Sequence, residues 1–209
     1  MISALEGLNL LREGNRRFVS DERSHDALMS HTRRSELTQG QEPFATIIGC
    51  SDSRVPVEVV FDQGLGDLFV IRVAGNIVAP SQVGSVEFAA ERFGTPLVVV
   101  LGHSRCGAIL ATIEQLRQPT KSKSRNLYSI VDRVRPSIEP LLDTELANNS
   151  DALVHHAVRA NIRASANHLR HGSELIEKLI AEDALLVVGA EYCLDTGVVD
   201  FFDGVPAET

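Results

Sequence analysis

The run Leu97-Val98-Val99-Val100-Leu101 constrains the fold of this chain more than any other stretch. It is apolar and mostly β-branched, and it is far shorter than the ~20 residues that cross a bilayer. This pattern predicts a strand that is buried on both faces. Similar short runs, which alternate with stretches of helical periodicity, occur at 44–49, 67–73 and 185–190. Short strands alternating with helices predict an α/β fold, a mostly parallel central β-sheet covered by helices on both faces.

The domain organisation follows from the lack of internal repeats and of any linker long enough to divide the sequence. We therefore predict a single domain over residues 1–209, in which residues 1–40 form an N-terminal helical arm. Apolar residues at helical spacing over 2–19 predict the first helix of this arm. That helix can pack on its own domain or lie on a neighbouring chain, and the sequence favours neither. Farther along, we expect a helix over 85–93 with Ser81 or Ser85 as its N-cap.

The net charge and the cysteine content indicate which binding partners and which cellular compartment to expect. The net charge of −8 argues against a nucleic acid or an acidic membrane as partner, because both require clustered Lys and Arg. The first helix carries charges within its apolar pattern and lacks the apolar core of a signal peptide, so we expect a cytoplasmic protein. Three cysteines in such a chain suggest metal binding or catalysis before disulfides.

Chemically active side chains follow two of the predicted strands. Cys50 comes directly after the first strand, and Asp52 and Arg54 follow at two-residue steps. His103 ends the strand that contains the apolar run, and Cys106 comes three residues later. Residues three apart can face one way on a helical turn. Because ligands bind at the carboxyl ends of strands in an α/β sheet, we expect these side chains to meet in a cleft there.

Two thiolates and one imidazole form a ligand set for zinc. Catalytic zinc sites keep three protein ligands and an open fourth position, so Cys50, His103 and Cys106 favour a catalytic site. Asp52 is a candidate fourth ligand, a base or an ordinary surface acid, and Arg54 is its partner or a solvated charge. Alternate residues in an extended segment point the same way, so the two can form a bidentate pair. We expect Asp52 to ligate zinc at lower pH and to leave at higher pH, where hydroxide competes better for the metal.

Taken together, these motifs resemble those of the β-class carbonic anhydrases. The resemblance extends from about residue 3 to 203, and its segments are Cys50-Ser-Asp-Ser-Arg-Val55, Gly66-Asp-Leu-Phe-Val-Ile-Arg72, Ala74-Gly-Asn76, His103-Ser-Arg-Cys-Gly107 and the closing Gly189…Gly197. It implies an enzyme that holds Zn²⁺ with Cys50, His103 and Cys106. It also implies Asp52 and Arg54 as the catalytic dyad in the reversible hydration of carbon dioxide to bicarbonate and a proton.

The resemblance further implies a set of substrate-binding residues. Gln41, nine residues before the first cysteine, is similar to the substrate-side glutamine of the plant-type branch, whose site is open. Phe69 and Phe88 resemble the apolar walls of the pocket, and Gly107 would offer its backbone N–H to the substrate. The family often has Tyr where this chain has Phe88, so a hydroxyl contact is lost there.

The resemblance implies a homodimer, often paired into a homotetramer, in which part of the pocket wall comes from the neighbouring chain. Two other functions stay open. One is a zinc hydrolase of carbon disulfide or carbonyl sulfide on the same fold, because the zinc site alone does not choose among these substrates. The other is a non-catalytic, zinc-binding regulatory protein, which would result if Asp52 stayed permanently on the metal.

Overall fold

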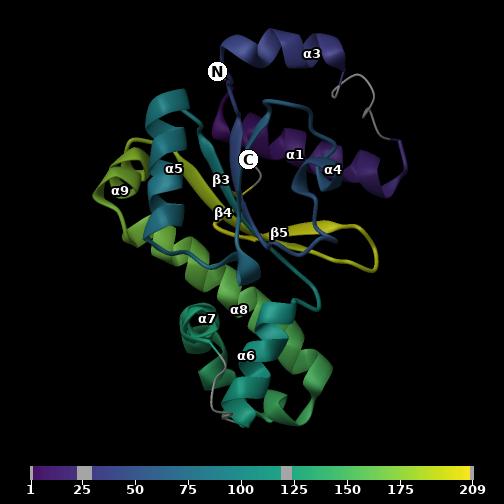
Figure 1. The fold of residues 1–209 in the computed structure, drawn as a ribbon, viewed down its shortest axis with the longest axis vertical. Coiled ribbons are helices and arrows are strands. Elements are labelled where there is room, and N and C mark those ends of the chain that lie inside the picture. Colours follow the sequence, from purple (N-terminus) through teal and green to yellow (C-terminus); the bar gives the residue numbers. More distant parts are fainter. Residues whose placement is uncertain (1, 23–29, 119–123, 208–209) are drawn as a thin grey trace.

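The computed structural model of the protein describes residues 2–22, 30–118 and 124–207, so part of the predicted arm (residues 1 and 23–29) lies outside it. The predicted α/β architecture is confirmed (Figure 1). Five strands form one sheet in the order β2-β1-β3-β4-β5. Their bounds are β1 Ala45–Gly49, β2 Leu68–Arg72, β3 Leu97–His103, β4 Leu186–Tyr192 and β5 Val199–Asp203. The first four are parallel, and β5 pairs antiparallel with β4.

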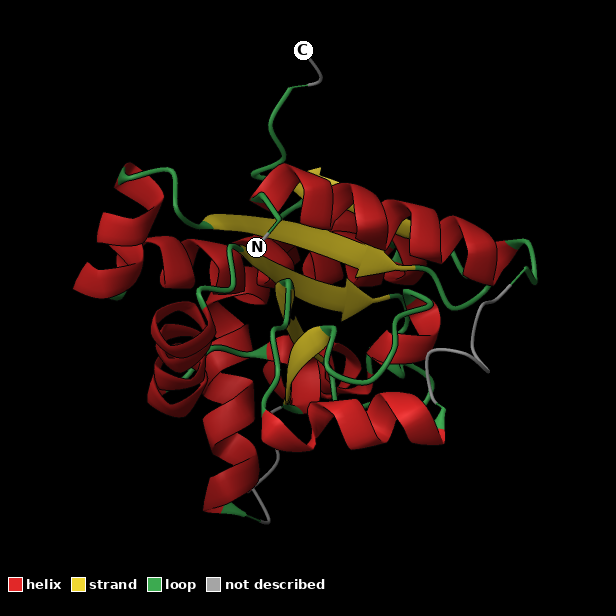
Figure 2. Cartoon of the chain, turned by 90° about the horizontal axis from the view of Figure 1, so that it is seen from above, coloured by secondary structure: helices red, strands yellow, loops and turns green. Residues whose placement is uncertain are grey.

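Helices cover both faces of this sheet (Figure 2). Their bounds are α1 Ala4–Val19, α3 His31–Glu36, α4 Val57–Val60, α5 Pro80–Phe93, α6 Gly107–Arg117, α7 Arg125–Leu142, α8 Ser150–His171 and α9 Glu174–Ala181. Short 3₁₀ turns lie at η1 Leu37–Gln39, η2 Ala74–Asn76 and η3 Glu145–Asn148. No helix among the described residues is both long and apolar enough to cross a membrane.

The apolar run in β3 separates two hydrophobic cores. Val98 and Val100 pack into the core formed with α5 to α9, whereas Leu97, Val99 and Leu101 pack into the core formed with α1 and α4. Successive side chains of a strand point to opposite faces, so a continuous apolar run serves both cores at once. All seven residues of β3 are buried.

Helix α1 packs on the sheet of its own chain. Ser3 and Glu6 form a capping box at its start, and Leu8 and Leu11 are buried among strand residues. Asn15, only 5% exposed, donates to the carbonyl oxygens of Val60 and Gly197. Of the two roles left open for this helix, the structure shows packing on its own domain.

Helix α5 begins earlier than expected. The prediction of a start at 85 with a serine cap is wrong, because the helix begins at Pro80 and its N-cap, Ala79, makes no side-chain cap. Proline suits the first helical turn, where a backbone N–H has no partner in the helix. Ser85 instead lies inside the helix, and its hydroxyl donates to the carbonyl of Ser81. The predicted end at residue 93 is confirmed, and Gly94 caps the helix with a φ of 65°.

Candidate metal centre

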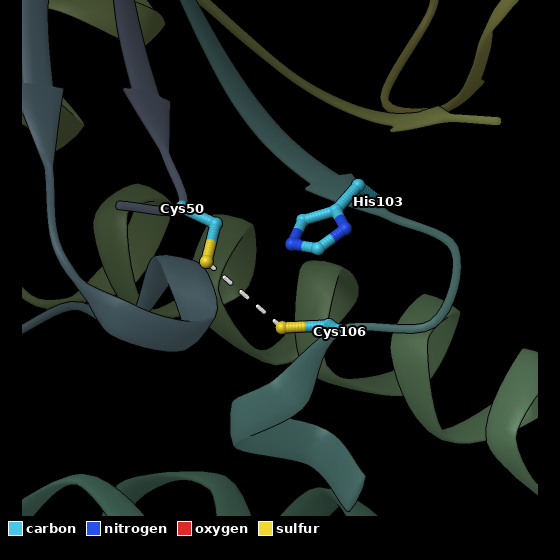
Figure 3. Close-up of side chains that lie close together, drawn as sticks. All are labelled: Cys50, His103 and Cys106. Carbon is cyan, nitrogen blue, oxygen red and sulfur yellow. Dashed lines mark hydrogen bonds between the residues drawn. The ribbon is translucent and has the colours of Figure 1, made fainter. Parts of the chain in front are cut away.

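Two adjacent strands bring the predicted metal ligands together. Cys50 follows the last residue of β1, and His103 is the last residue of β3. Gly49 and Leu101 are register partners in these strands, so both strands end at the same edge of the sheet. Cys106 is the N-cap of α6, the helix that leaves this edge. Figure 3 shows the two sulfurs and one ring nitrogen of His103 facing a common space.

The path from His103 to Cys106 differs from the expected helical turn. His103 still belongs to the strand, and Arg105 between the two adopts a φ of 55°, in the left-handed region. A tight turn therefore folds the chain back, and the helix starts only after Cys106. The spacing of three residues was the correct signal, but its structural cause is a strand–turn–helix junction.

The distances among the ligand atoms suit a tetrahedral zinc ion. One ligand atom from each of Cys50, His103 and Cys106 lies within 4.8 Å of the others, and the two sulfurs are 4.0 Å apart. Zinc–sulfur bonds of about 2.3 Å at tetrahedral angles place two sulfurs about 3.8 Å apart. The three residues are 5%, 0% and 1% exposed, respectively, so the chain presents them already gathered and desolvated.

His103 is fixed in the tautomer that a metal ligand needs. Its Nδ1 lies 2.9 Å from the carbonyl oxygen of Ser104, so Nδ1 carries the proton and donates it. The Nε2 atom is buried and has no hydrogen-bond partner among the described residues. A backbone carbonyl that orients the second ring nitrogen is a usual feature of metal-bound histidines. The buried, unpaired Nε2 is the polar atom that a metal would satisfy.

The two thiols of the cluster shift each other's pKa in opposite directions. A hydrogen bond from Cys106 is the main cause that lowers the pKa of Cys50 to about 4, and the backbone N–H of Gly75 adds to it. The pKa of Cys106 is raised, first because it donates that hydrogen bond and then because it is buried. Since zinc ligates the deprotonated form of both, metal binding by this chain releases a proton from Cys106.

Asp52 and Arg54 form the bidentate pair that the sequence predicted as one alternative. Arg54 Nε and Nη2 lie 2.9 and 2.7 Å from Asp52 Oδ1 and Oδ2. The pair closes around a turn, in which the backbone N–H of Arg54 also donates to Oδ1, and not along an extended segment. These bonds hold the pKa of Asp52 well below its usual range. The carboxylate stands beside the cluster, with Oδ2 3.8 Å from Nε2 of His103. That Asp52 joins the metal at lower pH stays a prediction.

Two contacts around Cys50 escaped the sequence reasoning. Arg72, the last residue of β2, donates to the carbonyl oxygens of Cys50 (2.9 Å) and Asp52 (2.6 Å) and so clamps this loop. Gly75 donates its N–H to the sulfur of Cys50 over 3.4 Å. Both lie in segments that carried the family resemblance, which is the one signal that could have marked them.

The predicted substrate-binding residues do not lie together within one chain. Gly107 is the exposed first residue of α6, directly after Cys106, so its N–H lies in the helix turn beside the cluster. Phe69 pairs in register with Thr46, four residues before Cys50 and therefore about 13 Å away along the strand. Phe88 packs on Phe69, with ring centroids 6.3 Å apart, and is 53% exposed.

Gln41 lies at the same far edge of the sheet. It lines a surface cavity together with Leu37, Gly66 and Phe93. The ring of Phe93 in turn contacts Phe69 and Phe88. One chain thus carries the metal ligands at the carboxyl edge of its sheet and the predicted apolar wall at the amino edge.

Known proteins match both the sequence and the fold. The family model described as carbonic anhydrase matches residues 45–199. Carbonic anhydrase 2 of Mycobacterium tuberculosis is 38% identical over 189 residues, which cover 90% of this chain and 87% of that protein. A carbonic anhydrase of Mycolicibacterium smegmatis is 37% identical over 190 residues, with coverage of 91% and 89%.

Solved structures give the same result. The β-carbonic anhydrase CcaA superposes with a TM-score of 0.73 at 26% identity, covering 97% of this chain and 91% of that one. The β-carbonic anhydrase CafA of Aspergillus fumigatus gives a TM-score of 0.73 at 26% identity, covering 83% and 82%. The matched residues include all three of the gathered cysteine and histidine ligands. The chain belongs to the β-class carbonic anhydrase family.

Proposed function

We propose that this protein is a zinc enzyme that catalyses the reversible hydration of carbon dioxide to bicarbonate and a proton. The observation that carries the proposal is the buried Cys50–His103–Cys106 cluster with an ionised, oriented carboxylate, Asp52, beside it. Zinc, when bound, acts as a Lewis acid that lowers the pKa of water toward neutrality.

Asp52 is the residue we assign to orienting the attacking water. Its Oδ1 accepts two hydrogen bonds from Arg54, and its Oδ2 accepts one. Oδ2 also lies on the side of the cluster where Nε2 of His103 is unpaired, so a free lone pair can accept a hydrogen bond from water there. Arg54 keeps the carboxylate in this orientation and away from the ligand position. The formed pair therefore supports the open-site arrangement.

Gly107 is the residue we assign to holding substrate oxygen. It starts α6, and the first N–H groups of a helix have no carbonyl partner within it. The residue is exposed, and apart from its chain neighbours and the nearby backbone of its own helix no described atom lies within 4 Å of the position that a Cβ would take there. The positive end of the helix favours the developing charge of bicarbonate.

We also propose that the working unit contains at least two chains. Phe69, Phe88 and Gln41 can wall the pocket only if they come from a second copy, because in their own chain they lie at the opposite edge of the sheet from Cys50. The exposed Phe88 ring is suited to such a contact. Two β-carbonic anhydrases of Sordaria macrospora, one of which superposes with a TM-score of 0.70, are described as tetrameric.

A cytoplasmic location belongs to the same proposal. The described thiols of Cys50, Cys106 and Cys193 are free, and the cluster needs two of them reduced. Reduced thiols persist in the cytosol, where glutathione and thioredoxin maintain them.

Stopped-flow mixing with carbon dioxide and a pH indicator tests the activity. The zinc-loaded protein should accelerate acidification at alkaline pH, and the Cys106→Ala variant, treated in the same way, should not. No acceleration by the zinc-loaded protein would refute the proposal. Rapid turnover of carbon disulfide or carbonyl sulfide with negligible hydration would assign the hydrolase function instead. Full zinc occupancy without turnover of any of these substrates would assign the regulatory one.

A further inference from the structure

A buried amide on α8 is connected to the metal centre through one turn of the chain. Nδ2 of Asn161 donates to the carbonyl oxygen of Gly75 over 2.8 Å. The N–H of the same glycine donates to the sulfur of Cys50 over 3.4 Å. Asn161 is 2% exposed and Gly75 is buried, so water does not compete for either bond.

Contacts from two helices hold this turn, whose backbone lies in a region that few residue types adopt readily. Gly75 has a φ of 71°, and Asn76 follows with a φ of 43°. Glycine occupies the left-handed region without steric cost, whereas Asn76 does so less readily, so contacts that fix the turn stabilise it. Ser165, one helical turn after Asn161 on the same face of α8, donates to the carbonyl of Asn76 over 3.1 Å. A Cβ on Gly75 would lie 3.0 Å from the Cβ of Ala108, so α6 confines the turn from the other side.

The side chains around Asn161 give a reason for an amide at this position. Apart from Ser165, its neighbours on the buried face of α8 are apolar, among them Ala157, Val158 and Ile162. An apolar residue would fill the space, but it would leave the buried carbonyl of Gly75 without this donor, and a buried polar group without a partner costs about 1–3 kcal/mol. Asn161 therefore serves the turn and not only the packing of the helix.

We propose that Asn161 is a positioning residue of the metal centre, which holds the Gly75 N–H on the sulfur of Cys50. An N–H···S bond fixes the direction of the sulfur lone pairs and withdraws charge from the thiolate. A thiolate with less charge to donate leaves the metal more electrophilic, which offsets the two negative ligands of this site. The inference rests on the proposed zinc site, and its test separates the two.

The test compares Asn161→Ala with a matched control, Ser165→Ala. Both remove one buried donor from α8 to the same turn, but only Asn161 acts on the residue that bonds Cys50. Zinc affinity is measured by competition with a chromophoric chelator. Metal–sulfur bonding is measured by the thiolate-to-metal charge-transfer absorption of the cobalt-loaded proteins. If the wild-type protein binds neither zinc nor cobalt, the proposed zinc site itself is wrong, and the inference about Asn161 fails with it.

We expect Asn161→Ala to bind zinc at least about tenfold more weakly than wild type, because the sulfur of Cys50 is no longer held in position, and to shift the charge-transfer band, because the thiolate then donates more charge. Ser165→Ala should stay within about twofold in affinity with the band unmoved. Equal changes in both variants would show a merely structural role, and no change in Asn161→Ala would likewise overturn the inference. If Asn161→Ala does not fold, nuclear magnetic resonance of the wild-type protein loaded with ¹¹³Cd decides. A scalar coupling between ¹¹³Cd and the Gly75 amide proton supports the N–H···S bond, and its absence refutes the inference.

Discussion

Asn15 attaches α1 to the rest of the chain through buried and partly buried hydrogen bonds. Its Nδ2 donates to the carbonyls of Val60 (3.1 Å) and Gly197 (2.9 Å), and its Oδ1 accepts from the N–H of Val199 (2.9 Å). One side chain thus connects α1 to α4 and to the β4–β5 connection. Asn15→Ala leaves three backbone groups without this partner, two of them in buried bonds and one in a partly buried bond.

The loss in the free energy of unfolding follows from the number of hydrogen bonds that Asn15 makes. At about 1 kcal/mol for each hydrogen bond, Asn15→Ala should lower the free energy of unfolding by about 3 kcal/mol. With a urea slope of about 2 kcal/mol per M, the unfolding midpoint should fall by about 1.5 M. The melting temperature should fall by about 6–12 °C for a chain of this size.

The assay is urea unfolding followed by circular dichroism at one fixed protein concentration, because association also shifts the midpoint. Asn9→Ala is the matched control, since Asn9 is exposed on the same helix and accepts only a long bond of 3.5 Å from Arg12. The control should change stability by less than about 0.5 kcal/mol. If Asn15→Ala behaved like the control, α1 would not be docked on its own chain in solution.

Three further predictions concern the dyad, the metal and the N-terminal cap. Arg54→Ala should keep stoichiometric zinc and lower kcat/KM about 10–100-fold. Arg54→Lys should recover only part of the lost kcat/KM, because lysine lacks the bidentate fork of arginine. Wild-type turnover in Arg54→Ala would refute the dyad. Cys106→Ala should lose its zinc on dialysis, as measured by atomic absorption, and full retention would contradict the ligand assignment. The amide N–H and hydroxyl of Ser3 lower the pKa of Glu6, so Glu6 stabilises the fold above its ordinary pKa of 4.5 and loses this effect as the pH falls through the lowered value. The urea midpoint of Glu6→Gln should lie below that of wild type at neutral pH and approach it as the pH falls through the lowered pKa of Glu6, and a constant difference would contradict the cap.

The strands and the metal ligands could be predicted from the sequence because both are local signals. A continuous apolar run such as 97–101 is compatible with few environments, and Cys50 and His103 stand directly at strand ends. The start of α5 was missed because Ser81 and Ser85 look like caps, whereas Pro80 supplies the start by its fixed φ.

Contacts between distant segments could not be predicted in this way. Asn161 reaches Gly75 across 86 positions, and a lone asparagine in a helical pattern carries no sign of its partner. The same limit applies to Phe69 and Phe88, because their distance from Cys50 depends on strand register and not on residue type. The resemblance indicated what these positions are for, but the sheet shows that one chain cannot bring them together.

The proposed site divides into a buried part, which would hold the metal, and an exposed part, which would work on the substrate. The three metal ligands are at most 5% exposed, and the turn behind Cys50 is fixed by α8. By contrast, the side chains of Asp52 and Arg54 are 16% and 53% exposed, and the pair contacts the ligands only at its edge. Metal affinity and turnover should therefore be separable, since changes at Asn161 act on metal affinity and changes at Arg54 act on turnover. A double variant at these two positions should combine both losses nearly additively, because Asn161 bonds Gly75, Arg54 bonds Asp52, and sites without a shared partner usually add. Strong coupling between them would mean that the loop carrying Asp52 moves with Cys50 as one unit, and the clamp that Arg72 places on both carbonyls would be the physical reason.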